Sequence, residues 1–153
     1  MKLAEALIIR ADLQKRIGQL KARLKDSAKI QEGDTPAEDI KDLNEELDTC
    51  LAQLEDLIYR INVTNMNTIH DGESLTRMMA RKDALNIRLG VMRELVAHVT
   101  ESDARYGRNE IKYVRTVDVA ELRRTTDAFS KQLRELDTQI QGLNWTTDLL
   151  ENV

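Results

Sequence analysis

The sequence predicts an all-α protein of about four long helices, arranged as an antiparallel four-helix bundle or as paired long helical hairpins. Its 153 residues include one proline and six glycines, too few breakers for a chain of many short elements. Charged residues make up 33% and aromatic residues only 3%, a balance typical of long helices with solvated faces. Apolar residues also recur at steps of three and four along four stretches, which is helical spacing.

The first helix is predicted from about Lys2 to Ser27. Arg10 occupies one step of its apolar stripe, and a polar segment around Gly33 ends the pattern. The other residues of the stripe fall on one face of a helix, and they are Leu3, Ala6, Leu13, Ile17, Leu20 and Leu24.

The second helix is predicted to start at a capping box, Thr35-Pro36-Ala37-Glu38, with proline in the first helical position. Leu51 and Ile58 widen its stripe, which favours contact with more than one neighbouring helix. Cys50 lies within the stripe and is expected to be a small core residue. The heptad seam itself is Ile40, Leu43, Leu47, Cys50, Leu54, Leu57 and Ile61.

A polar stretch from Asn62 to Glu73 contains the turn signal His70-Asp71-Gly72 and is predicted to separate the second helix from the third. The third helix is predicted from about Ser74 to Thr100, with Lys82 occupying one step of its stripe. Its remaining stripe residues are Leu75, Met78, Leu85, Leu89, Met92, Val96 and Val99.

The segment 106–117 is rich in β-branched and aromatic residues and predicts either a short β-hairpin or an extended loop. Asp118 with Glu121 then forms a second capping signal, which opens a fourth helix. The stripe of this helix is Leu122, Phe129, Leu133, Leu136, Ile140 and Leu143.

An internal duplication is predicted. The first helix matches the third at a shift of about 72 residues, which pairs Arg10 with Lys82, and the second matches the fourth at about 82, which pairs Asn62 with Asn144. We therefore expect a single domain over 1–153, with hairpin 1 at about 2–64 and hairpin 2 at about 74–150. The difference between the shifts places about ten extra residues in the segment 106–117.

Charge supports pairing within the first hairpin. From Lys2 to Lys25 there are seven basic residues and two acidic ones, whereas Glu32 to Asp56 holds ten acidic residues and only Lys41 as a base. A basic helix beside an acidic one predicts antiparallel pairing, in which flanking charges select the partner.

Four polar residues are candidates for a polar core between the hairpins: Arg10, Lys82, Asn62 and Asn144. Arg10 and Lys82 either form an anion or carboxylate site or are registry-setting interruptions whose stems snorkel to solvent. The two asparagines are predicted to hydrogen-bond chain ends or each other.

A basic segment with interleaved tyrosines is the second candidate site. It is predicted to contact a protein partner or second subunit, with a solvated loop and an anion or nucleic-acid patch as the alternatives. Its candidate residues are Arg105, Arg108, Lys112, Tyr113 and Arg115.

No catalytic constellation is predicted. The chain has no phosphate-binding loop or nucleophile motif, and Glu94 with His98 has a spacing of four where a di-metal bundle uses three. We expect no enzyme activity, cofactor, metal or small-molecule substrate. A net charge of −4 gives no strong nucleic-acid signal. We also expect no signal peptide or membrane span, and a cytoplasmic location.

Three stretches resemble a small, uncharacterised bacterial helical family. They are the run from Leu3 to Ile17, the pair Glu110-Ile111-Lys112 and Thr116-Val117-Asp118-Val119, and Leu143-Asn144-Trp145-Thr146-Thr147. Some members of that family carry the label septicolysin, and this resemblance implies a pore-forming cytolysin. The resemblance supplies no catalytic or binding residues.

The sequence leaves function unknown and favours a non-enzymatic helical protein that acts through protein–protein contacts or self-assembly, as a homo-oligomer. The septicolysin-like cytolysin is the alternative, and a metal-binding or enzymatic bundle is a further one.

Overall fold

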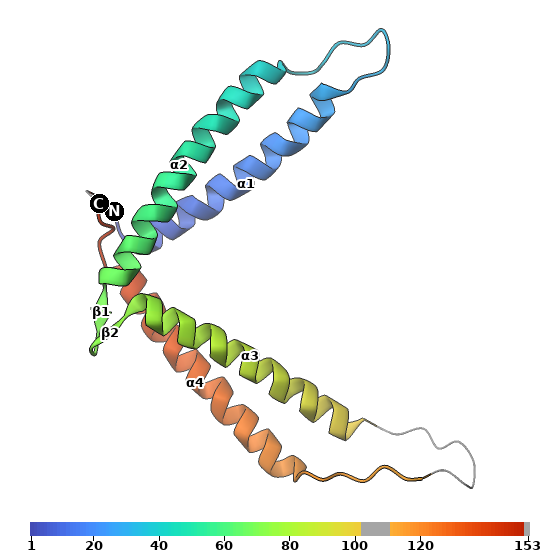
Figure 1. Cartoon of the computed structure of the whole chain (residues 1–153), viewed down its shortest axis with the longest axis vertical. Helices are drawn as coiled ribbons and strands as arrows, with labels where there is room; N and C mark the ends of the chain where they lie inside the picture. The colour runs from blue at the N-terminus through green and yellow to red at the C-terminus, as the bar shows by residue number, and fades with distance from the viewer. Residues whose placement is uncertain (102–110, 152–153) are drawn as a thin grey trace. The chain divides into compact units, whose positions relative to one another are not determined.

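A computed structural model describes residues 1–101 and 111–151 and confirms the all-α class with paired hairpins (Figure 1). Two compact units are present: unit 1 comprises Met1–Thr76 with Gln141–Val153, and unit 2 comprises Arg77–Ile140. Helix α1 lies beside α2 to form hairpin 1, and α3 lies beside α4 to form hairpin 2. In order, the elements are α1 (Leu3–Ala28), α2 (Ile40–Asn67), β1 (Ile69–His70), β2 (Glu73–Ser74), α3 (Leu75–Thr100) and α4 (Val119–Thr146).

The core of hairpin 1 follows the predicted seams. Leu20 of α1 packs with Leu43 and Cys50 of α2, and all three are buried. Partly buried apolar residues surround them, namely Leu13, Ile17, Leu24 and Leu47. Cys50 is therefore the small core residue that the sequence predicts.

Ion pairs join the basic α1 to the acidic side of the hairpin, as predicted. Arg16 donates to Glu46 Oε1 from Nε at 3.0 Å and from Nη2 at 2.6 Å. Arg23 holds both carboxylate oxygens of Glu38. The hydrogen bond from Arg23 lowers the pKa of Glu38, and the bond to Glu46 raises the pKa of Arg16. These side chains are partly exposed to solvent, so the pairs act more on partner choice than on stability.

The capping box predicted at Thr35 is wrong. Helix α2 begins at Ile40, and Asp39 caps it by accepting a hydrogen bond from the backbone N of Lys41 at 2.8 Å. The carboxylate of Glu38 binds Arg23 of α1 and does not reach back to the backbone of Thr35. A contact across the hairpin has therefore replaced the local cap.

Helix α2 also runs further than predicted, to Asn67, and Thr64 and Asn65 are buried. The turn predicted at His70-Asp71-Gly72 is confirmed. It joins β1 to β2 through Asp71 and Gly72, whose φ angles of 50° and 80° are both positive. Such a two-residue loop suits a tight antiparallel hairpin, and Gly72 adopts its φ without the strain of a side chain.

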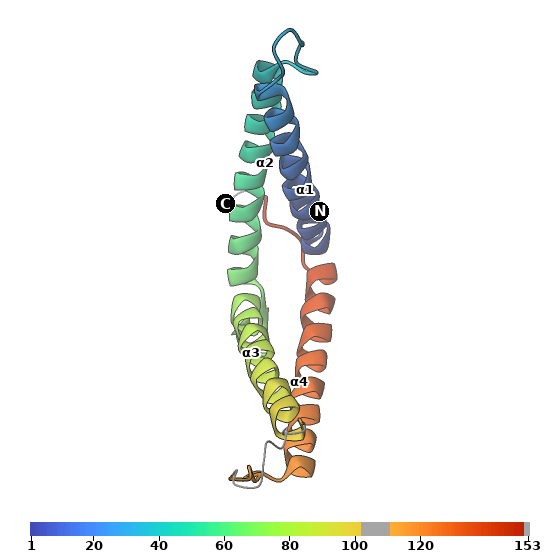
Figure 2. The ribbon, with the colours of Figure 1, turned by 90° about the vertical axis from the view of Figure 1, so that its right-hand side faces the viewer.

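The two chain ends are tied together within unit 1, where the segment that follows α4 runs between α1 and α2 (Figure 2). Backbone hydrogen bonds run from Leu3 N to Thr147 O and from Leu149 N to Met1 O, each 2.9 Å long. Lys2 Nζ lies 2.8 Å from Asp148 Oδ1, and this hydrogen bond lowers the pKa of Asp148. We call these contacts the terminal clasp.

The clasp is anchored on α2. The hydroxyl of Thr64 accepts a hydrogen bond from Leu150 N at 3.0 Å, and Arg60 Nε donates to Leu150 O at 3.0 Å. Thr64 is 1% exposed, and its hydroxyl also donates to Arg60 O. A side chain in α2 therefore holds a residue 86 positions later in the chain.

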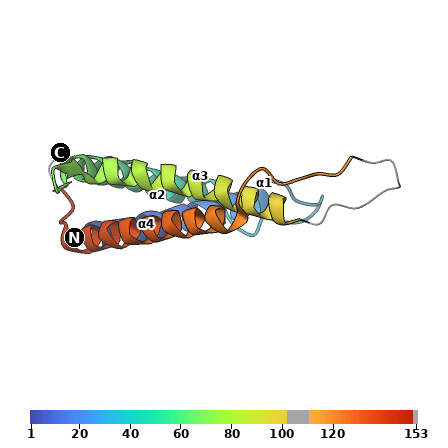
Figure 3. The ribbon, with the colours of Figure 1, turned by 90° about the horizontal axis from the view of Figure 1, so that it is seen from below.

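In unit 2, α3 and α4 run side by side (Figure 3), and the core lies along the seam between them. Its buried apolar residues are Met78, Leu89, Met92, Leu136 and Ile140. The predicted cap of α4 is confirmed, because Asp118 Oδ1 accepts hydrogen bonds from the backbone N of Ala120 and Glu121. Residues 111–117 form no strand, so they follow the loop alternative, and 106–110 lie outside the described residues.

The helix bounds correct one part of the predicted duplication. Helix α3 follows α1 at a shift of 72 residues, as predicted, but α4 follows α2 at 79, not 82. At 79, buried Leu57, Ile61 and Asn65 fall on buried Leu136, Ile140 and Asn144. The Asn62–Asn144 equivalence is therefore wrong, because matching short letter strings displaced the alignment by nearly one helical turn.

Candidate partner-binding surface

Helix α3 carries a second apolar stripe that α4 does not cover. Ile87, Val91 and Leu95 are 71%, 53% and 38% exposed, and exposed Ala84 precedes them. At about 100° per residue, these side chains lie on the side of α3 opposite buried Leu89. We call Ala84, Ile87, Val91 and Leu95 the outer stripe.

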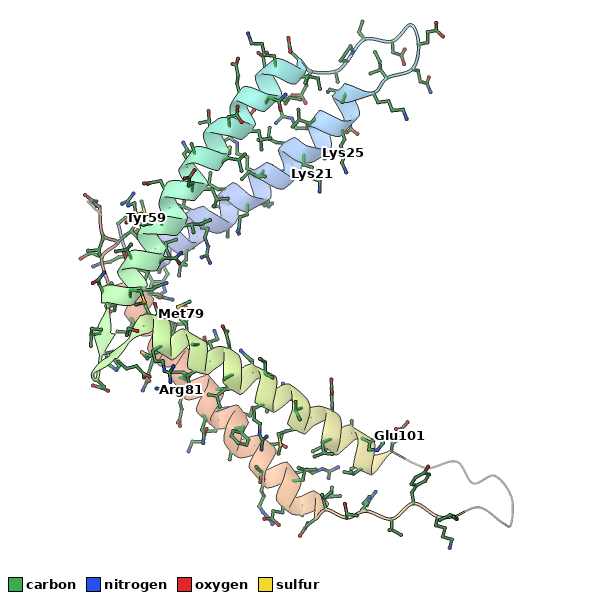
Figure 4. All side chains as sticks on the ribbon, in the orientation of Figure 1. Lys21, Lys25, Tyr59, Met79, Arg81 and Glu101 are labelled. Carbon is green, nitrogen blue, oxygen red and sulfur yellow. The ribbon has the colours of Figure 1, made fainter. Side chains whose placement is uncertain are left out.

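The two edges of the outer stripe carry opposite charge. Helical spacing places Arg81 and Arg88 along one edge and Asp83 and Glu94 along the other. Figure 4 labels Arg81 near the start of α3. The Arg88 guanidinium lies 5.5 Å from the centre of the Phe129 ring on α4, a cation–π distance that leaves its outward N–H donors for a carboxylate.

The stripe leads into a groove at the far end of α3. The groove has a volume of about 730 Å³ and lies between the last turns of α3 and the segment 113–117. On α3 it is lined by Leu95, His98 and Val99, and Glu101, just after the helix, lines it as well. Arg115 Nε donates to Val99 O at 2.5 Å and so ties the segment to the helix. Leu95 belongs to both surfaces, which are therefore continuous.

The predicted basic-aromatic site is assembled in part. Tyr113 and Arg115 line this groove, and Lys112 is exposed beside them. These side chains are open to solvent, and Tyr113 is 87% exposed. Arg105 and Arg108 lie outside the described residues. Contact with a partner stays a prediction for these five residues.

The predicted polar core divides between the two hairpins. Lys82 Nζ lies 2.5 Å from Asp137 Oδ1, so this interruption in the α3 seam has an acidic partner on α4. At the shift of 79 the position equivalent to Asp137 is Ile58, so hairpin 1 offers Arg10 no matching carboxylate there. Asn62 is exposed and Asn144 is buried. A joint site of these four residues between the hairpins stays a prediction.

The chain matches the family of unknown function DUF6847 over residues 10–149. It belongs to this family. It is also similar to a functionally unknown conserved protein from Corynebacterium diphtheriae, known from a crystal structure, at 41% sequence identity. That similarity covers 98% of this chain and 99% of the other, with a TM-score of 0.91. No curated protein matches the chain.

Sequence reasoning missed the outer stripe of this DUF6847 chain. The signal was present, because Ala84, Ile87, Val91 and Leu95 follow helical steps of three and four. It was hidden by the stronger stripe through Leu85 and Leu89, which accounts for the helix without it. The equivalent positions on α1 are polar: Asp12, Lys15, Gln19 and Arg23.

Within 1–101 and 111–151, no cluster of three or more His, Cys, Asp or Glu side chains has an arrangement that could hold a metal ion. Over the same residues, no helix has the length and apolar character needed to span a bilayer. The outer stripe and the groove that continues it are the candidate functional surface, because they combine exposed apolar residues with a lined depression.

Proposed function

We propose that this protein is a non-enzymatic helical protein that works through protein–protein contacts and assembles with itself. The observation that carries the proposal is the outer stripe, an apolar face opposite the seam that α4 fills. A helix that is apolar on two opposite sides needs a covering partner on each. Within the described residues α4 supplies only one of them.

Light scattering coupled to size-exclusion chromatography tests self-assembly. We expect a mass above the 17.5 kDa of one chain, increasing with loading over the micromolar range. The double variant Ile87→Gln with Val91→Gln is expected to shift the mass toward one chain. Lys15→Gln, at the position of α1 equivalent to Ile87, is the matched control and should leave the mass unchanged. A mass of 17.5 kDa for the unmodified chain at every loading would overturn the proposal.

The resemblance to proteins labelled septicolysin supplies a second candidate function, that of a membrane-active cytolysin. The observation that favours it is the arginine edge of the outer stripe, because helices that lie in a membrane interface combine an apolar stripe with bordering basic residues. Dye release from liposomes containing anionic lipid tests it. Leakage that Ile87→Gln with Val91→Gln abolishes would support this candidate, and absence of leakage at micromolar protein would reject it.

We also propose that the protein is located in the cytoplasm. Support comes from the one cysteine, Cys50, which is a buried free thiol. Fractionation of cells that express the tagged chain tests this, and recovery in the membrane or secreted fraction would contradict it.

A further inference from the structure

We propose that the outer stripe of α3 binds hairpin 1 of a second copy, with α2 of that copy running antiparallel to α3. This inference rests on the proposed self-assembly and names its contact. Hairpin 2 of the first copy binds hairpin 1 of the second copy, and hairpin 2 of the second copy can bind hairpin 1 of the first in the same way. The result is a closed dimer with two-fold symmetry.

The net charges of the two units favour this contact. Unit 1 contains 10 basic and 17 acidic residues, which gives −7, whereas unit 2 contains 13 basic and 10 acidic residues, which gives +3. Opposite potentials attract during encounter, whereas unit 2 facing a second unit 2 is repelled. The partner that suits the outer stripe is thus the acidic unit.

Hairpin 1 offers an apolar surface whose spacing matches that of Ala84 and Val91 in the outer stripe, which also lie seven residues apart. Leu51 and Ile58 lie seven residues apart on α2 and are 44% and 37% exposed. Asp48 and Glu55 lie beside them and form an acidic edge.

The other edge of this surface is basic. In hairpin 2, Lys82 reaches Asp137 on one side of the α3–α4 seam, and Arg93 lines a second depression on that side together with these two residues. At the shifts of 72 and 79 these residues correspond to Arg10, Ile58 and Lys21. Arg10 and Lys21 of α1 therefore lie on the same side of hairpin 1 as Ile58 of α2, and Figure 4 labels Lys21 on α1.

The two surfaces complement each other edge by edge. Hairpin 1 presents an acidic edge, an apolar centre and a basic edge, whereas α3 presents a basic edge, the outer stripe and an acidic edge. Each edge can be named by the direction, clockwise or counter-clockwise from the apolar centre, in which it lies when its helix is viewed from the N-terminus. In an antiparallel pair the two clockwise edges meet each other, and so do the two counter-clockwise edges. The acidic edge of α2 then faces Arg81 and Arg88, and the basic edge faces Asp83 and Glu94. A parallel orientation would instead bring like charges together.

Two charge pairs follow from this orientation. When Leu51 is set against Val91 and Ile58 against Ala84, Glu55 faces Arg88. On the other edge, Arg10 lies beside Ile58 and so faces Asp83, which is next to Ala84 on α3. The contact thus supplies Arg10 with the carboxylate that hairpin 1 does not offer at the position equivalent to Asp137.

Two reciprocal contacts also bury more surface than one contact does. A standard protein–protein interface buries about 800 Å² on each partner. The four residues of the outer stripe cover only part of that, and two symmetric copies of the contact double it. A closed dimer is therefore favoured over a single stripe-to-hairpin contact.

A mixing experiment in the analytical ultracentrifuge tests the proposal on full-length chains. The stripe variant is Ile87→Gln with Val91→Gln, and the hairpin variant is Leu51→Gln with Ile58→Gln. We expect the unmodified chain to be a dimer and each variant alone to associate at least tenfold more weakly. An equimolar mixture should associate more than either variant, because one of the two contacts is intact in the mixed pair.

Circular dichroism confirms that each variant is helical. If mixing restores nothing, or if the hairpin variant dimerises normally, the proposal is overturned, and a contact between two α3 helices replaces it. An unmodified chain that is monomeric would overturn the proposed self-assembly itself, so the two failures are distinguishable.

A charge exchange provides a second test that leaves the apolar residues in place. Arg88→Glu is expected to weaken dimerisation at least fivefold, and Arg88→Glu with Glu55→Arg in the same chain is expected to recover most of it. Lys15→Glu is the control for a change of charge on a helix exterior outside the contact. A double variant as weak as Arg88→Glu alone would overturn the antiparallel pairing.

Discussion

The two hairpins share an inner plan and differ on their outer surfaces. Helices α1 and α3 both have 26 residues, α2 and α4 both have 28, and buried Leu20 corresponds to buried Met92. On the outside, polar Lys15 and Gln19 of α1 correspond to Ile87 and Val91 of α3. The seam is needed in both copies for folding, so the difference outside it indicates where the copies have separate roles.

The polar contacts across each seam differ as well. Hairpin 1 is joined by the ion pairs of Arg16 and Arg23 with carboxylates near α2, whereas hairpin 2 has the Lys82–Asp137 pair and Arg88 over Phe129. Hairpin 1 also contributes Thr64 to the terminal clasp, at a position that is Leu143 in hairpin 2. Among the described residues, hairpin 1 and the chain ends are therefore joined by contacts that differ in kind from those of hairpin 2.

The largest expected effect comes from truncating the shared core position in each hairpin. Leu20→Ala is expected to lower the free energy of unfolding by about 3 kcal/mol, because Leu20 is fully buried and the cavity cannot collapse completely. Met92→Ala should cost less, about 2 kcal/mol, because Met92 retains slight exposure. Urea unfolding followed by circular dichroism measures both, with exposed Met66→Ala as control. A larger loss for Met92→Ala would reverse the comparison.

A smaller effect is expected at the terminal clasp. Thr64→Val keeps the shape of the side chain but leaves Leu150 N without its acceptor, which should cost about 1–2 kcal/mol. Proteolysis of the last residues should accelerate in parallel. Thr138→Val, an exposed threonine on α4, is the matched control and should change neither quantity. Unchanged stability and proteolysis in Thr64→Val would show that the backbone bonds of the clasp suffice.

Replacing the cation within each seam, Lys82 or Arg10, should change the free energy of unfolding by amounts that differ by a few tenths of a kcal/mol. Lys82→Met is expected to lose about 0.5 kcal/mol, because its pair with Asp137 is partly exposed. Arg10→Met should be neutral when measured in protein too dilute to associate, since hairpin 1 has Ile58 where hairpin 2 has Asp137. Unfolding of both variants, and of Lys82→Met in an Asp137→Asn background, measures the pair. An equal loss at Arg10 and Lys82 would contradict the difference.

The smallest effect is a dependence of hairpin 1 on pH. Arg23 lowers the pKa of Glu38 below its ordinary value of 4.5, so the folded state binds the proton more weakly than the unfolded state does. The contribution of this pair is full above about pH 4.5 and is lost as pH falls through the lowered pKa of Glu38. Stability measured from pH 6 to 2.5 should fall less steeply in Glu38→Gln than in the unmodified chain. Identical slopes would show that the pair contributes nothing measurable.

Local signals predicted most of the fold. Heptad spacing located four helices, Asp118 marked the start of α4, and Asp71-Gly72 marked a tight turn, because periodicity and caps act over a few residues. The candidate surface was only half predicted. Tyr113 and Arg115 were identified from composition, whereas the outer stripe was missed because one helix carried two valid apolar patterns.

The sequence by itself determined the all-α class, the two seams and the repeat of α1 in α3, since each is written in short-range spacing. Tertiary structure alone decided where α2 begins and ends. Arg23 binds the carboxylate of Glu38, which therefore does not cap the helix start predicted at Thr35. The backbone N of Leu150 donates to the hydroxyl of Thr64, 86 residues earlier in the chain. It also decided which apolar residues remain uncovered: Leu89 and Ile87 are equally apolar, and only the position of α4 buries one and exposes the other. Pairing partners distant in the chain cannot be read from spacing, because spacing specifies a face and not its neighbour.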